Sequence, residues 1–250
     1  METFGDPMHS LAQHIMRLPG LLARGKTLMA KELSPETVAR IRELIGDCFE
    51  VDDRMKEWVP ISGETWLPRT VGYISSVPKD LANAPAWIGP VHIFTDVQQP
   101  STINKQRAAR IVTAELILDC LKKILPDTYE DDLQFRKAQH TIQSAVDEIC
   151  YSVPGLLGIN SGMPNWCSEP STPGVDFFAS IGAFQLIWPT SVAYSAPGIS
   201  DAQRQWLHGR LDVIGKRWGF EQALVMKNLL GQRRGLYEVQ HAISEQQINE

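Results

Sequence analysis

One segment constrains the fold of this chain more than any other. Residues 175–196 are apolar almost all the way round, and no charged side chain follows Asp176 within them. A segment of this kind, ~20 residues long, has to leave water, either inside a bilayer or inside a protein. Gln185, Pro189 and Thr190 interrupt its apolar character, and serines and prolines flank it. These residues favour a buried central helix, kinked at Pro189, over a membrane span.

Helical spacing of apolar residues on both sides of this segment predicts an all-α fold. Ser34 precedes one such stretch as a helix cap, and Ser200 with Gln203 forms a capping box before another. The sequence therefore predicts a single helical domain over residues 1–250, built as a multi-helix bundle. The expected helical stretches besides 175–196 are 9–30 (with a bend at a Pro-Gly pair), 35–59, 101–125, 131–151, 201–214 and 220–230.

Residues 60–100 break the helical pattern with six prolines and several aromatic residues. A flexible linker would be polar and poor in aromatic residues. We therefore expect an irregular but ordered connection packed onto the helices, with a helical turn or two inside it. Residues 152–173 are rich in Gly, Pro, Ser and Asn and predict a loop anchored by Trp166, and the polar tail 244–250 is expected to fray.

Composition and charge exclude several classes of protein. With 43% hydrophobic and 21% charged residues the chain has the composition of a globular protein. A net charge of −5 argues against wrapping nucleic acid or lying on an anionic membrane. The cysteines and histidines lack the close spacing of metal ligands, so no metal site is expected. Residues 1–10 lack the pattern of a secretory signal, which predicts an intracellular protein, nuclear or cytoplasmic.

One polar stripe is a candidate for acid–base chemistry. His140, Ser144, Asp147 and Tyr151 fall within an arc of ~60° on one predicted helix, opposite its apolar face. A histidine and a carboxylate on one stripe can form an acid–base pair in which the carboxylate orients the ring. The competing interpretation is a solvated helix face. Motifs for nucleotide binding or serine hydrolysis do not occur in the sequence, so this chemistry would need no cofactor.

Aromatic residues on and around the proline-containing segment are candidates for a ligand pocket. A proline kink opens a helix against its neighbours, and small-molecule pockets are mostly apolar. The competing interpretation is a filled core without a pocket. The candidate ligand-binding residues are Trp87, Trp166, Phe177, Phe178, Phe184, Trp188 and Tyr194.

Three sequence blocks, in order, carry a resemblance to a known family. They are QRAARI at 106–111 followed by AELIL at 114–118, DEICYSVPGLLG at 147–158, and GAFQLIWP at 182–189 leading into 203–215. Over residues 100–230 they resemble the fungal-specific transcription factor domain, the C-terminal regulatory region of zinc-cluster transcription factors. The resemblance implies an all-helical fold with a regulatory, effector-responsive role. The cysteine-rich zinc cluster that precedes this region in the family does not occur in this sequence, so the expectation is a regulatory half without a DNA-binding head.

The sequence leaves two functions open. In the first, the chain binds a small apolar metabolite or a protein partner and regulates transcription without touching DNA or a membrane, with a homodimer also open. In the second, the chain is a cofactor-independent enzyme of fungal secondary metabolism. It would catalyse a cyclisation or a proton transfer in an apolar pocket, with His140, Asp147 or Tyr151 moving the proton. An open cavity would favour the enzyme. A filled core with an exposed apolar patch would favour the binding module.

Overall fold

The computed structural model describes residues 7–61, 67–94, 98–158 and 177–231. Tertiary contacts group the chain into two compact units. The first unit comprises Met1–Leu67 and Ala109–Ser144, and the second comprises Pro68–Ala108 and Ala145–Glu250. Helices α4 (Gln98–Ile124) and α5 (Leu133–Leu156) contribute residues to both units.

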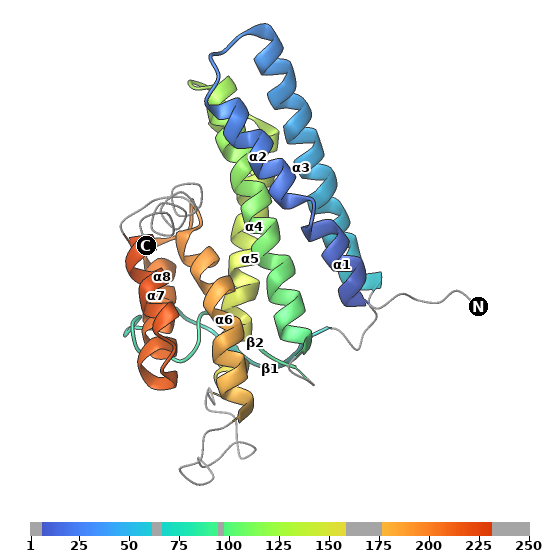
Figure 1. The fold of residues 1–250 in the computed structure, drawn as a ribbon. Coiled ribbons are helices and arrows are strands. Elements are labelled where there is room, and N and C mark those ends of the chain that lie inside the picture. Colours follow the sequence, from blue (N-terminus) through green and yellow to red (C-terminus); the bar gives the residue numbers. More distant parts are fainter. Residues whose placement is uncertain (1–6, 62–66, 95–97, 159–176, 232–250) are drawn as a thin grey trace, which may run out of the picture. The chain divides into compact units, whose positions relative to one another are not determined.

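The first unit contains three N-terminal helices, α1 (Pro7–Ile15), α2 (Leu18–Met29) and α3 (Pro35–Ile61), of which α1 and α2 pack one after the other along α3 (Figure 1). Ser34 caps α3 as predicted, because its Oγ accepts a hydrogen bond from the Thr37 N–H at 3.1 Å. The apolar face of α3 is fully buried at Ile41 and Leu44. A short 3-10 helix, η2 (Tyr129–Asp131), precedes the α5 residues of this unit.

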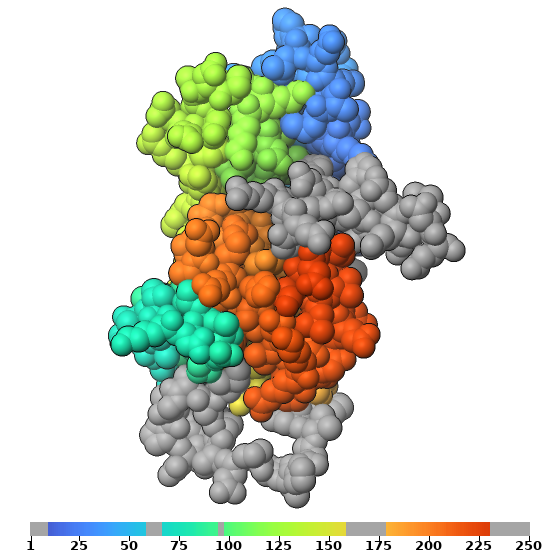
Figure 2. Space-filling model, turned by 90° about the vertical axis from the view of Figure 1, so that its left-hand side faces the viewer, coloured from blue at the N-terminus to red at the C-terminus, as the bar shows by residue number. Residues whose placement is uncertain are grey.

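The second unit holds a small antiparallel sheet, β1 (Arg69–Ile74) and β2 (Gly89–Ile93), with an irregularity in register between Thr70 and Gly72. The helices α6 (Phe177–Ser195), α7 (Asp201–Trp218) and α8 (Glu221–Gly231) follow, and they pack against one another. Figure 2 shows the orange α6–α7 residues and the red α8 residues forming a broad surface beside the teal segment 67–94.

The all-α class is confirmed, because the residues the structure describes are mainly helical and contain only a two-stranded sheet. The sheet is nevertheless a correction to the prediction for residues 60–100, which expected irregular structure with helical turns. Its strands are five and six residues long and lie among prolines, so they leave almost no two-residue periodicity to detect. Helix α5 also runs past Tyr151 and through Pro154, so the expected loop at 152–173 begins later than predicted.

Helix α6 lies where the sequence placed it, with Pro189 inside it, but it is not buried on every side. Ala183, Leu186 and Val192 are buried, whereas Phe184 is 60% exposed and Trp188 is 44% exposed. The prediction of a buried helix is therefore wrong for this face. Within the described ranges, the structure contains no helix with the length and apolar character needed to span a membrane.

The start of α7 and the end of α6 are fixed by caps. Ser200 Oγ accepts a hydrogen bond from the Gln203 N–H at 3.2 Å, which confirms the predicted N-cap. The Arg204 guanidinium donates to the carbonyl oxygens of Tyr194 and Ala196, which belong to the last turn of α6 and the residue after it. These bonds satisfy carbonyl groups that a helix end would otherwise leave without partners.

Candidate functional site

The candidate site lies in the second unit, where the C-terminal part of α5 meets α7 and the small sheet. Asp147 on α5 accepts a hydrogen bond from Gln203 Nε2 on α7 at 2.7 Å. The same amide lies 3.6 Å from Cys150 Sγ. Gln203 is 1% exposed. Its side chain bonds to α5, whereas its backbone N–H donates to the Ser200 cap. The carboxylate of Asp147 thus links two helices.

Tyr151, one turn further along α5, packs against β2. Its ring lies edge-on to the His92 ring, with 5.6 Å between the centroids and 79° between the planes. Gly89 approaches the ring so closely that a Cβ there would lie 2.3 Å from Tyr151 Cε1. Gly89 also has φ 122°, which a side chain rarely tolerates, so two independent requirements place glycine at this position.

Burial sets the protonation states of this ring pair. It raises the pKa of Tyr151 to about 12, with the Asp147 charge adding to the effect. Burial, together with the positive charge of Arg107, lowers the pKa of His92 to about 4. At neutral pH the tyrosine is therefore protonated and the imidazole is uncharged. Neither group has the pKa near 7 that suits a general acid or base.

A hydrogen-bonded chain of side chains connects α4 to α5 beside this pair. Arg107 Nε donates to Glu148 Oε2 at 2.9 Å, and Arg107 Nη1 donates to Asn104 Oδ1 at 2.8 Å. Asn104 Nδ2 donates to Ser152 Oγ at 3.0 Å, and that hydroxyl donates to the Ile149 carbonyl at 2.7 Å. Arg107, Asn104 and Ser152 are all buried. A network of this kind fixes the register of two helices.

The predicted acid–base pair is not assembled. His140 is exposed and belongs to the first unit, while Asp147 and Tyr151 belong to the second. Along α5, His140 and Asp147 are seven positions apart, which corresponds to about 10 Å of helix axis. Sequence reasoning also missed the tertiary partners Arg107 and Gln203. An arginine inside an apolar helical stretch was the available signal for Arg107.

The predicted pocket aromatics lie in different surroundings. Trp87 is buried against Trp206, with 5.9 Å between ring centroids, and the ring of buried Tyr194 lies 5.8 Å from that of His208. Phe184 and Trp188 lie on the exposed face of α6. The described aromatic side chains therefore do not converge on a single apolar pocket. Trp166 and the side chains of Phe177 and Phe178 lie outside the described residues.

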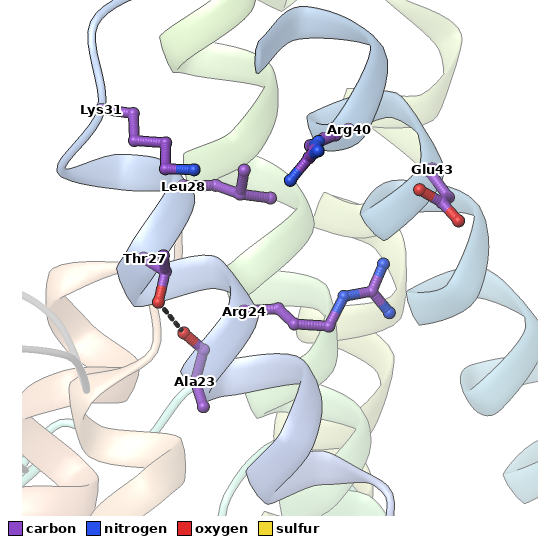
Figure 3. A pocket seen from close by; sticks show the side chains of 7 residues that line it. All are labelled: Ala23, Arg24, Thr27, Leu28, Lys31, Arg40 and Glu43. Atoms are coloured by element: carbon purple, nitrogen blue, oxygen red, sulfur yellow. Dashed lines mark hydrogen bonds between the residues drawn. The ribbon is translucent and has the colours of Figure 1, made fainter. Parts of the chain in front are cut away.

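A groove of about 540 Å³ does occur, but in the first unit between α2 and α3 (Figure 3). Two of its charged side chains form ion pairs: Arg24 with Asp47 at 2.5 Å and Arg40 with Glu36 at 2.8 Å. The groove is open to solvent and has charged side chains beside apolar ones, unlike the enclosed aromatic pocket that the sequence predicted. Its lining residues are Ala23, Arg24, Thr27, Leu28, Lys31, Arg40 and Glu43, none of which was a predicted site residue.

The cysteines of the described part of the chain are not poised for nucleophilic chemistry. Burial raises the pKa of Cys48 and of Cys120 to about 12, and it also raises the pKa of Cys150. A thiol that stays protonated is a poor nucleophile and a poor metal ligand. Among the described residues, no group of three or more His, Cys, Asp and Glu side chains is arranged to hold a metal ion.

Comparisons of the chain with protein-family models, with curated proteins and with solved structures find no match.

Proposed function

We propose that this chain is a regulatory binding module, similar to the regulatory region of fungal zinc-cluster transcription factors, which takes a protein partner on the exposed face of α6. The observation that carries the proposal is the exposure of Phe184 and Trp188, one turn apart, on a helix without a charged residue. The acidic net charge of −5 fits a module that does not bind DNA directly.

The exposed face of α6 differs from an ordinary helix surface. A helix on the surface of a globular protein normally turns charged or polar side chains to water. On α6, the exposed and partly exposed residues over about two turns contain no charged side chain. We call them the α6 stripe: Ser180, Ile181, Phe184, Gln185 and Trp188. The exposed parts of its two aromatic side chains amount to about 230 Å², and burying them contributes about 5–6 kcal/mol before the costs of association.

The other ligands and activities have less support. A small apolar metabolite would need an enclosed apolar pocket, whereas Trp87 and Tyr194 are buried in the interior and the described groove is open to solvent and partly lined by charged side chains. The alternative function, a cofactor-independent enzyme, would use His140, Asp147 or Tyr151. His140 is exposed and belongs to the first unit, Asp147 accepts a hydrogen bond from Gln203, and Tyr151 packs on the sheet. No observation favours the enzyme over the binding module.

A reporter assay tests the proposed function. The chain is fused to a heterologous DNA-binding head and placed upstream of a reporter gene in a fungal host. We expect the fusion to change transcription, and we expect Phe184→Glu/Trp188→Glu to abolish the change. Leu133→Glu is the matched control, because Leu133 is an apolar side chain that is 78% exposed outside the stripe. The proposal is contradicted if the fusion leaves transcription of the reporter unchanged, or if the double variant changes it as much as the wild type does. Tight, sequence-selective DNA binding by the isolated chain would also contradict it.

A further inference from the structure

We infer that the partner on the α6 stripe is a second copy of this chain, related to the first by a two-fold axis that pairs the two α6 helices antiparallel. The inference rests on the proposed function, because it names the occupant of the same surface. Two properties of the stripe support it, its charge and its spacing, and its area sets the expected strength of the contact.

The charge of the stripe favours pairing with itself. In a two-fold contact the same surface meets itself, so charged residues near the axis meet charges of their own sign. Two copies of a chain with net charge −5 repel each other overall. Helix α6 carries no charged residue from Phe177 to Ser195, whereas α3 and α7 both carry acidic and basic residues. A self-contact centred on α6 therefore avoids this repulsion.

The spacing of the two aromatic residues allows them to pair across a two-fold axis. Phe184 and Trp188 are four residues apart, which places them on one face with about 6 Å of rise between them. When two such helices pair antiparallel around an axis near Leu186, Phe184 of each copy lies opposite Trp188 of the other. One kind of contact, made twice, then covers all four exposed rings. Phe184 is already held in place by Phe220, whose ring centroid lies 5.7 Å away, so little side-chain freedom is lost on pairing.

The area of the stripe predicts a weak dimer. A stable specific interface buries about 800 Å² on each partner, whereas the exposed parts of the two aromatic side chains supply about 230 Å². The aromatic residues thus form the centre of the contact, and neighbouring surface has to supply the remainder. We expect a dimer that dissociates in the micromolar range and equilibrates rapidly with the monomer.

Sedimentation velocity on the full chain, from about 1 to about 300 µM, tests the inference. The wild type and Leu133→Glu are expected to pass from monomer to dimer within this range. Phe184→Glu/Trp188→Glu and Phe184→Lys/Trp188→Lys are each expected to stay monomeric, with dimerisation weakened at least about 10-fold, because they place like charges across the axis. An equal mixture of the two double variants is expected to dimerise again. This recovery also shows that both variants are folded.

Two results overturn the inference: a wild type that is monomeric at every concentration, and a Glu double variant that dimerises like the wild type. Their meaning for the proposed function differs. If the wild type is monomeric but the reporter response still depends on Phe184 and Trp188, the stripe binds a different protein and only the identity of the partner is wrong. If the reporter response does not depend on them either, the proposed function fails as well.

Discussion

Replacing Gly209 by alanine is expected to release the segment around Ala82 from α7. A Cβ at Gly209 would lie 2.2 Å from the Ala82 carbonyl oxygen, about 1 Å closer than such atoms approach in proteins. Moving this segment lengthens two hydrogen bonds: Trp206 Nε1 donates to the Ala84 oxygen at 3.0 Å, and Arg210 Nη2 donates to the Ala82 oxygen at 2.6 Å. The bond from the charged arginine contributes about 1.5–3 kcal/mol and the other about 1 kcal/mol.

Alanine is a better helix former than glycine by about 1 kcal/mol, which offsets part of this loss. We therefore expect Gly209→Ala to lower the free energy of unfolding by about 1–3 kcal/mol, measured by urea unfolding with far-UV circular dichroism. Gly46→Ala in α3 is the matched control. A Cβ at Gly46 meets no atom within 4 Å, so this variant should gain about 0.5–1 kcal/mol relative to the wild type. A Gly209→Ala protein as stable as the wild type would refute the reasoning, as would equal destabilisation by the two substitutions.

Three further predictions concern a cap, a histidine and two thiols. Ser200→Ala removes the acceptor for the Gln203 N–H and should cost about 1 kcal/mol in urea unfolding; an unchanged midpoint would contradict the assigned cap. His92 has a pKa of about 4 in the folded state against an ordinary 6.5, so stability should be complete above pH 6.5 and decline as the pH falls toward 4. Because His92 is partly exposed, we expect a loss of about 1–2 kcal/mol that His92→Gln removes, and an identical pH profile in that variant would disprove the assignment. Cys48 and Cys120, with pKa values of about 12, should resist alkylation at pH 8 until urea unfolds the chain, as read by mass spectrometry; modification of the native protein at the rate of a free thiol would show that they are accessible.

The helices could be predicted from the sequence because their signal is local. The apolar spacing along 101–125 and the cap at Ser34 depend only on residues within a few turns, and the observed α4 and α3 follow them closely. The small sheet could not be predicted in this way. Its two strands pair across the intervening residues 75–88, and each is too short among prolines to establish an alternating pattern.

The candidate site was less predictable because its contacts are distant in sequence. The capping box assigned the Gln203 side chain to the local helix start, whereas in the structure that amide donates to Asp147, 56 residues away. The exposure of Phe184 and Trp188 was hidden for a different reason. Helix α6 is apolar in nearly every direction, so its sequence has no periodic contrast from which the solvent-facing side could be deduced.

The orientation of α6 about its own axis explains why these two aromatic residues stay exposed. Gly182 points at α5, where a Cβ would lie 2.2 Å from the Leu156 carbonyl oxygen. At 100° per residue, Phe184 and Trp188 lie roughly 160° and 120° around the helix from Gly182, on the far side from this contact. Rolling α6 to bury the aromatic rings would bring residues with larger side chains against the α5 backbone, where only glycine fits. The close packing of the interior therefore keeps the stripe at the surface. Because the stripe is already in place before a partner binds, the free-energy cost of reorganising it on binding is small.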